Sequence, residues 1–390
     1  MKLILAGVVA VVVLAACVGK SMAGEESTLQ LRQGDRLAIC GDSITEQRLY
    51  SVYIATYLAA CHPELDLDCT MSGRPGETAP AFAKRMEDTL GWFEPTVATT
   101  FFGMNDGGYK AYDPSISDAY RTGMHTVVSG LKGLGCQRLL ISSPGSVDTH
   151  YFKKLDPAVY NLNLATLGNI AREVAAIQRV DYVEMHRFQL ETMTRCKEKF
   201  GSDFKFAGDG VHLDRIGHVF LAYRFLRAMN LDADLARIEL HADGKAKASK
   251  GHRIVSSQSG KVTVESTRYP YLLTGGRGKA PTAPGTMANF LPFLDDLSRF
   301  LLVMPDCPWE QVQVQWGDAK WGNPIVVVTR EQMQAGYNLS TMVHPPILKD
   351  FYRVQSVDIA ICLYISLTSK SLRGARWPHA QMLHGSGFRS

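Results

Sequence analysis

The sequence predicts an α/β fold in which a parallel sheet carries helices on both faces, followed by a small C-terminal β-rich appendage. Two patterns carry this prediction. From Asp35 to about Leu231, short apolar runs alternate with longer amphipathic ones, as expected when strands and helices alternate. Towards the C-terminus, stretches such as "EQVQVQW" alternate apolar and polar residues one by one, which is typical of strands with one buried face.

The α/β part begins with the apolar strand "RLAIC" over 36–40, followed by a helix within 47–63. Further strands are expected within 65–73, 96–103, 136–145 and 179–186, and further helices within 78–93, 117–134 and 159–178. The loops that follow four of these strands are rich in Gly, Ser, Asn or Asp; they are 41–45, 72–78, 103–108 and 142–148. Because the carboxyl ends of parallel strands share one edge of the sheet, we expect the functional site at that edge.

The N-terminal residues 1–23 are typical of an export signal. One lysine precedes an apolar run from Leu3 to Ala16, which is too short for a stable membrane span. Two cleavage sites stay open: "SMA" ending at Ala23, and the lipoprotein-like "LAAC", where Cys17 would carry a lipid anchor. We therefore expect an exported protein that is secreted, periplasmic or anchored to a membrane through lipid.

Composition suggests the remaining boundaries. The main domain is expected over 30–232, and the polar, Gly/Pro-rich segment 233–290 is expected to be a linker or loop region. A small β-rich region is expected over 291–355. The tail 356–390 holds one acidic residue and has no amphipathic pattern, so no structure or function is assigned to it.

Charge and cysteine content exclude several classes of function. The formal net charge is +4 and the basic residues are scattered, so no nucleic-acid partner is expected. The eight cysteines form neither a CxxC pair nor a Cys/His cluster with zinc spacing, so we expect no metal and no other cofactor. Export permits disulfides, and a bridge between Cys61 and Cys69 is sterically conceivable, but two free thiols are the preferred interpretation.

Two separated motifs supply the groups that acyl transfer requires. The strand in "LAICGDSITE" ends in Gly-Asp-Ser, which leaves the Ser43 hydroxyl at the sheet edge. In "AGDGVHLDRIGH", Asp209 precedes His212 by three residues, so its carboxylate can reach Nδ1 and leave Nε2 to accept a proton. Ser43, His212 and Asp209 thus form a candidate catalytic set. The backbone N–H groups of Ser43 and Gly76 and the side-chain amide of Asn105 are natural oxyanion-hole donors.

The order of the motifs "GDS", "PGET", "GMND" and "DGVH" resembles the SGNH (GDSL-type) hydrolase family over residues 35–232. The resemblance implies a three-layer α/β/α sandwich with a flavodoxin-like sheet and a Ser-His-Asp triad. It matches Ser43, Gly76, Asn105 and His212 to the family's invariant residues. An α/β-hydrolase plan is excluded, because that fold places its serine in a mid-sequence G-x-S-x-G motif.

Other polar and aromatic residues receive structural interpretations. Asp42 is expected to brace the turn beside Ser43, and His218 to have a structural role on the last helix. Asp106 and Asp214 are expected to brace loops. The tryptophans expected to pack within the β-rich part, rather than to form a sugar-stacking platform, are Trp309, Trp316 and Trp321.

The sequence therefore predicts an exported serine esterase that hydrolyses O-acyl esters of a small molecule or a carbohydrate, with acetylated carbohydrate as one candidate. Two alternatives stay open. One is an O-acetyltransferase that uses the same site with a sugar hydroxyl in place of water. The other is a non-catalytic carbohydrate-binding protein with a degenerate hydrolase fold, against which the complete set of site residues argues.

Overall fold

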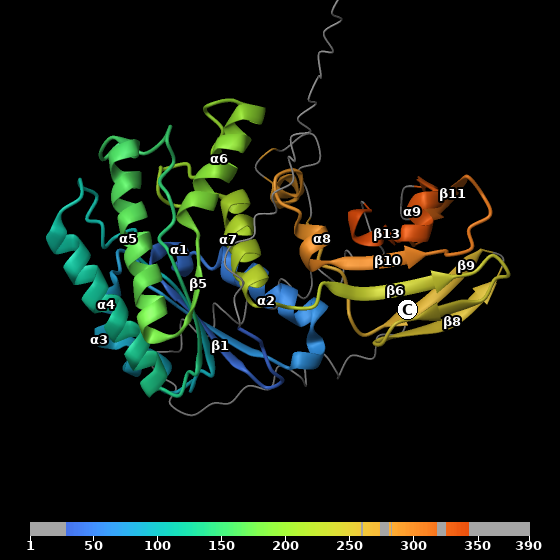
Figure 1. Cartoon of the computed structure of the whole chain (residues 1–390), viewed down its shortest axis with the longest axis horizontal. Helices are drawn as coiled ribbons and strands as arrows, with labels where there is room; N and C mark the ends of the chain where they lie inside the picture. The colour runs from blue at the N-terminus through green and yellow to red at the C-terminus, as the bar shows by residue number, and fades with distance from the viewer. Residues whose placement is uncertain (1–28, 259, 274–280, 282, 318–324, 343–390) are drawn as a thin grey trace, which may run out of the picture.

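The computed structural model describes residues 29–258, 260–273, 281, 283–317 and 325–342. Its α/β part is a five-stranded parallel sheet in the order β2-β1-β3-β4-β5, with helices on both faces (Figure 1). The strands are β1 (Arg36–Gly41), β2 (Asp68–Gly73), β3 (Val97–Phe101), β4 (Arg138–Ser142) and β5 (Asp181–Val183). This is the flavodoxin-like order, so the predicted three-layer α/β/α fold is confirmed. The winding reverses between β1 and β3, and ligands of such sheets bind at that point.

Alternate residues of β1 point to opposite layers, as the period of a strand requires. Leu37 and Ile39 pack in one buried cluster, and Ala38 and Cys40 pack in another. The first cluster includes α2 (Leu49–Cys61), α6 (His186–Phe200) and α7 (Arg215–Ala228). The second includes α3 (Ala79–Leu90), α4 (Pro114–Gly133) and α5 (Pro157–Gln178). The sheet is therefore buried on both faces, which explains why β1, β3 and β4 are buried along almost their whole length.

The local sequence sets where the helices begin. Helix α4 starts three residues earlier than the expected 117, because Asp113 accepts a hydrogen bond from the Ser115 N–H (2.8 Å) and Pro114 occupies the first helical position. Helix α5 starts in the same way, with Asp156 as its cap and Pro157 next. Helix α6 is an addition to the expected elements.

The β-rich part begins at residue 234 and contains a mixed four-stranded sheet in the order β13-β10-β6-β7 and two antiparallel hairpins. The sheet consists of β6 (Asp234–Leu240), β7 (Ala246–Ala248), β10 (Arg299–Val303) and β13 (Tyr337–Asn338). The hairpins are β8 (His252–Gln258) with β9 (Lys261–Ser266), and β11 (Gln311–Gln315) with β12 (Ile325–Thr329). Helices α8 (Phe293–Leu297) and α9 (Arg330–Ala335) accompany them.

The prediction of a linker or loop over 233–290 is therefore wrong for the strands β6 to β9. Within the polar stretch 241–252 and the hairpin after it, glycines form turns beside these strands; residues 274–280 of the Gly/Pro-rich stretch lie outside the described residues. Gly244, Gly251 and Gly260 have φ angles of 88°, 89° and 76°, a left-handed conformation that favours glycine. On the hairpin that follows, Val262 and Val264 pack against the core while their neighbours face outward.

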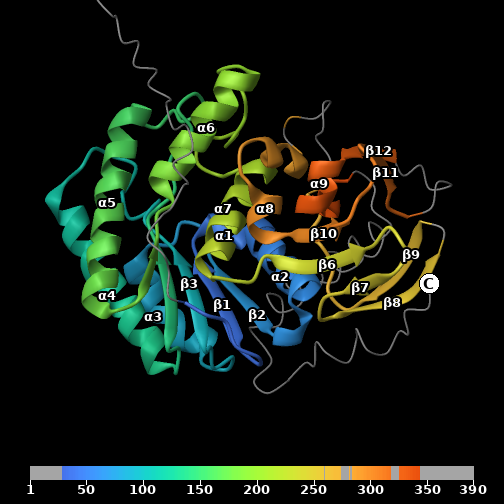
Figure 2. The same ribbon diagram turned by 45° about the vertical axis from the view of Figure 1, so that its right-hand side comes forward.

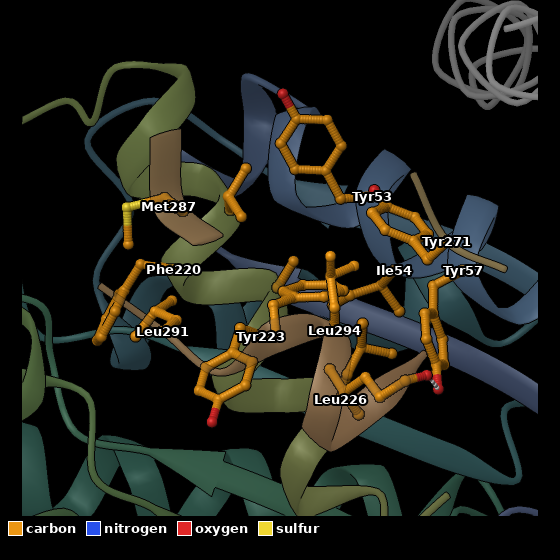
Figure 3. Close-up of a cluster of buried hydrophobic side chains, with 14 of the residues drawn as sticks. Tyr53, Ile54, Tyr57, Phe220, Tyr223, Leu226, Tyr271, Met287, Leu291 and Leu294 are labelled. Carbon is orange, nitrogen blue, oxygen red and sulfur yellow. Dashed lines mark hydrogen bonds between the residues drawn. The ribbon is translucent and has the colours of Figure 1, made fainter. Parts of the chain in front are cut away.

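The α/β part and the β-rich part share a hydrophobic core. In both ribbon views the β-rich part lies on the side of α2 and α7, away from α3 and α4 (Figures 1 and 2). Figure 3 shows side chains of α2 and α7 meeting those of the later segment; they are Tyr53, Ile54, Tyr57, Phe220, Tyr223, Leu226, Tyr271, Met287, Leu291 and Leu294. The Tyr57 hydroxyl also donates to the Leu297 carbonyl (2.7 Å), and the Tyr269 N–H to the Ala60 carbonyl (2.9 Å).

The structure tests the expectations for two of the tryptophans and for one pair of cysteines. Trp316 stacks on Phe300 with ring centroids 5.6 Å apart, as the packing interpretation predicts. Trp309 is 53% exposed, so packing is the wrong interpretation for that residue. Cys61 and Cys69 are not joined by a disulfide. The export signal with Cys17, the tail 356–390 and Trp321 lie outside the described residues.

Candidate active site

Ser43 is the first residue of α1 (Ser43–Glu46), a single helical turn that folds back onto the end of β1. Asp42 caps this turn by accepting a hydrogen bond from the Ile44 N–H (2.9 Å), which confirms its expected bracing role. Gly41 makes the close approach possible, because a Cβ there would lie 2.1 Å from Thr45 Oγ1. The strand thus ends with the Ser43 hydroxyl at the edge of the sheet.

Three side chains from two distant loops form a continuous hydrogen-bonded series. His212 Nε2 lies 2.8 Å from Ser43 Oγ, and His212 Nδ1 lies 2.6 Å from Asp209 Oδ2. The other oxygen of Asp209 accepts the backbone N–H groups of Val211 (2.8 Å) and His212 (2.7 Å). With Nδ1–H donated to the carboxylate, Nε2 carries the lone pair that faces the serine hydroxyl. This arrangement allows proton transfer from Ser43 to His212.

The carboxylate of Asp209 is held in its ionised form. Partial burial alone would raise the pKa of Asp209, but the hydrogen bonds from the His212 ring and from two backbone N–H groups outweigh it, so the pKa lies below its ordinary value. The side chains of His212 and Asp209 are 36% and 56% exposed. The acid–base pair is therefore open to solvent.

A buried ion pair holds the loop that carries these two residues. The Asp148 carboxylate is fully buried and lies 2.9 Å from Lys197 Nζ of α6. Its other oxygen accepts the Ala207 N–H (3.3 Å), and the Asp148 N–H donates to the Gly210 carbonyl (2.8 Å). The loop 142–148 after β4 is thus hydrogen-bonded, through Asp148, to residues on both sides of Asp209. The ion pair with Lys197 joins helix α6 to the same loop.

The candidate oxyanion donors come from three loops at the same edge. Gly76 has a φ of 69° in the turn after β2, so this position favours glycine. The Asn105 amide nitrogen lies 3.1 Å from the carbonyl of Glu77, the residue after Gly76, and 3.4 Å from Oδ2 of Asp42, the residue before Ser43. The structure thus brings the Asn105 amide together with both of the other loops.

Two carboxylates, those of Asp42 and Asp106, support these loops by accepting hydrogen bonds from backbone N–H groups. Asp106 accepts the Ala79 N–H (2.8 Å) and the Gly103 N–H (3.0 Å), which confirms that it braces loops. Burial raises the pKa of Asp106 and that of Asp42 to about 7 in each case. Asp214 is the residue that precedes α7 and makes no side-chain cap there.

His218 does not take part in the hydrogen-bonded series. It is fully buried, its Nε2 lies 2.8 Å from Oε1 of Gln47, and its ring stacks on Tyr50. Burial lowers the pKa of His218 to about 3, so the ring stays neutral. These contacts agree with the structural role expected for His218.

Several supporting residues escaped the sequence patterns. The hydroxyl of Tyr109 contacts the Asn105 side chain, and the Glu77–Arg85 ion pair lies beside the Gly76 turn. The two glycines before Tyr109 signal a tight turn, which is the one local signal available for it. No local pattern indicates the role of Lys197, because its partner Asp148 is distant in sequence.

Within the ranges that the structure describes, no group of three or more His, Cys, Asp or Glu side chains is arranged to hold a metal ion. None of the helices described there is both long and apolar enough to cross a membrane.

Comparison with known proteins identifies the domain. Residues 39–219 match the model of the GDSL-like lipase/acylhydrolase family, and this span contains every candidate site residue. The α/β domain belongs to that family, as the motif resemblance predicts. The protein is accordingly a carboxylic ester hydrolase.

Solved structures resemble this protein at low sequence identity. A gut microbial diltiazem-metabolizing enzyme aligns over 89% of this sequence and 81% of its own, with a TM-score of 0.71 and 20% identity. That coverage extends past residue 219, so the fold of the β-rich part is shared as well. An acetylxylan esterase from Geobacillus stearothermophilus aligns over 52% of this sequence and 98% of its own, with a TM-score of 0.44 and 21% identity. No curated protein matches the sequence.

Proposed function

We propose that the protein is an exported serine esterase that hydrolyses O-acyl esters. The single observation that carries this proposal is the series of hydrogen bonds from Asp209 through His212 to Ser43. In it, Ser43 Oγ attacks the acyl carbon while His212 Nε2 takes its proton, and the ionised Asp209 orients the ring and stabilises the imidazolium. His212 then returns the proton to the leaving alcohol.

The negative charge that forms on the carbonyl oxygen needs donors that are already in place. The backbone N–H groups of Ser43 and Gly76 and the Asn105 amide occupy three loops at this edge and are proposed as the oxyanion hole. The acyl-enzyme on Ser43 is then hydrolysed by water that His212 activates, which regenerates the serine.

The exposure of the acid–base pair favours hydrolysis of esters with large alcohols. With the His212 side chain 36% exposed and that of Asp209 56% exposed, water has access to the base, and a bulky alcohol such as a sugar can leave freely. We therefore propose acyl groups, including acetyl, on small molecules or carbohydrates as substrates. Transfer to a sugar hydroxyl would require water to be kept out of this open site.

The experiment is a substrate series with the intact protein and its Ser43→Ala variant. p-Nitrophenyl esters from acetate to laurate and acetylated xylan are each assayed for released acid. Released acid that depends on Ser43 supports the esterase. Acyl groups recovered on an added sugar, without free acid, would instead support the transferase, and carbohydrate binding without turnover would support the non-catalytic alternative.

The export proposal rests on the sequence of residues 1–23 alone. Fractionation of cells that produce the protein with these residues, followed by N-terminal sequencing, tests it. Cleavage after Ala23 or before a lipidated Cys17 supports export, and an intact N-terminus in the cytoplasm contradicts it.

A further inference from the structure

Tyr109 follows the "GMNDGG" loop, and its ring turns back onto Asn105. The Tyr109 hydroxyl lies 3.0 Å from Asn105 Oδ1. Between Asn105 and Tyr109 the backbone forms a tight turn, in which the Gly108 N–H donates to the Asn105 carbonyl (3.0 Å). Tyr109 itself has a φ of 54°, in the left-handed region that a tyrosine rarely adopts. Such strain is retained where the surrounding structure imposes it, often at functional sites.

The contacts of Asn105 fix which end of its amide faces which neighbour. On one side lie the Glu77 carbonyl and the Asp42 carboxylate, at 3.1 and 3.4 Å from Nδ2. A carbonyl accepts only, so Nδ2 must lie on that side. Oδ1 then faces Tyr109, and the Tyr109 hydroxyl is the donor in the 3.0 Å hydrogen bond.

The Tyr109 ring is itself firmly held. It stacks on Tyr160 with centroids 5.3 Å apart and on Phe152 with centroids 6.3 Å apart. The Tyr109 N–H donates to the Tyr160 hydroxyl (3.2 Å), and the Lys154 ammonium lies 3.3 Å from the centroid of the Tyr109 ring. Burial raises the pKa of Tyr109 to about 12, so the hydroxyl keeps its proton at neutral pH.

We propose that Tyr109 is a positioning residue of the oxyanion hole. Tyr109 holds the Asn105 amide in the orientation in which Nδ2 donates to the developing oxyanion. The inference rests on the proposed function and adds a residue to it. The terminal torsion of an asparagine is broad and roughly two-fold, so a neighbour must select one orientation. Tyr109 does so by donating to Oδ1, which also polarises the amide and strengthens Nδ2 as a donor.

The test is a double-mutant cycle with Tyr109→Phe and Asn105→Ala, assayed on p-nitrophenyl acetate with the intact protein. Tyr109→Phe keeps the stacked ring and removes one oxygen. We expect kcat to fall about 10-fold, the scale of a single well-placed hydrogen bond, with KM changed less than about twofold. In the Asn105→Ala background, the same change should lower kcat no further, because the amide that Tyr109 orients is gone.

The control removes the same atom from a neighbouring tyrosine. Tyr112 lies three residues further on and is 47% exposed, so Tyr112→Phe should leave kcat and KM unchanged. Thermal unfolding midpoints of all variants separate loss of fold from loss of orientation. If Tyr109→Phe leaves kcat unchanged while Asn105→Ala lowers it, the role of Tyr109 is overturned but the proposed function is not. The same holds if Tyr109→Phe lowers kcat about 10-fold again in the Asn105→Ala background. An unimpaired Asn105→Ala variant overturns the proposed oxyanion role itself.

Discussion

His212 Nε2 lies 2.8 Å from Ser43 Oγ, although 169 residues separate the two in sequence. The parallel sheet explains this proximity. Ser43 follows the first strand of the sheet, and the His212 loop precedes α7, which packs on α2 beside the same strand ends. Both side chains are half-buried and lie outside the hydrophobic clusters, so substitutions at either residue should leave the core intact.

The base and its orienting acid should differ in importance. His212→Ala removes the proton acceptor, so activity should fall to the residual level that the oxyanion hole and binding supply. Asp209→Asn leaves an imidazole that still acts when it is aligned, so its loss of kcat should be smaller or at most equal. Steady-state kinetics on a p-nitrophenyl ester measure both.

The same residues should act as one unit. Ser43→Ala combined with His212→Ala should cost little beyond either change alone, because the contributions of cooperating groups are not additive. Losses that multiply independently, or an Asp209→Asn variant far worse than His212→Ala, would show that another residue serves as the base.

Asn105 should stabilise the transition state and contribute little to the binding of the substrate. Asn105→Ala should lower kcat by roughly 10²- to 10³-fold, the effect of removing one oxyanion donor, with little change in KM. Asp113→Ala is a useful control, since Asp113 caps α4 and takes no part in the contacts described for the site. A rise in KM with normal kcat would identify Asn105 as a ground-state binder.

His218 should affect the pH dependence of stability instead of catalysis. Burial lowers the pKa of His218 from 6.5 to about 3, so between these values the unfolded state takes up a proton that the folded state does not. Its contribution to stability is complete above pH 6.5 and is lost as pH falls towards 3. His218→Gln removes this dependence and keeps a polar partner for Gln47.

The comparison is between unfolding free energies of wild type and His218→Gln in urea at pH 7, 6, 5 and 4. The buried carboxylates with raised pKa, Asp42 and Asp106, act in the opposite direction over this range, but they cancel in the difference. The advantage of wild type over the variant should shrink as pH falls. A constant difference would mean that His218 titrates normally, and a loss of hydrolysis with intact fold would give it a catalytic role.

The buried ion pair should stabilise the loop that carries Asp209 and His212. Lys197→Met leaves the Asp148 carboxylate buried without its cation, so we expect a loss of about 3–5 kcal/mol in unfolding free energy. Lys199→Met, on an exposed position of the same helix, is the matched control and should cost less than about 0.5 kcal/mol. Urea unfolding measures both, and equal losses would contradict the role given to the pair.

The elements that the sequence predicts well are those with a strong local signal. The strands β1, β3 and β4 are short runs of mostly apolar residues, and the loops after them are rich in Gly, Ser, Asn or Asp, so the site could be placed at the sheet edge. The strands β6 to β9 escaped prediction, because many of their own residues are polar and the turns between them are polar as well. Helix α6 carries mostly polar residues, which conceal the buried Phe188, Met193 and Cys196.

The supporting contacts of the site were beyond local patterns for a different reason. Asp148 and Lys197 act through partners that the fold, and not the sequence spacing, brings near. Tyr109 lies four residues from Asn105, and the two glycines between them are its one local signal. Asp209 and His212 could be paired in advance because a three-residue spacing lets one turn join them. Trp309 is a different case: it was expected to pack within the β-rich part, yet it precedes β11 and is exposed.

The nucleophilic role of Ser43 is the central claim, and covalent labelling tests it most directly. The intact protein is treated with a fluorophosphonate that reacts with activated serines, and the adduct is located by intact-mass measurement and peptide mapping. We predict one adduct per molecule, on Ser43, that is lost in Ser43→Ala together with ester hydrolysis and is strongly slowed in His212→Ala. An adduct on another residue, or a Ser43→Ala variant that retains wild-type turnover, would contradict the account.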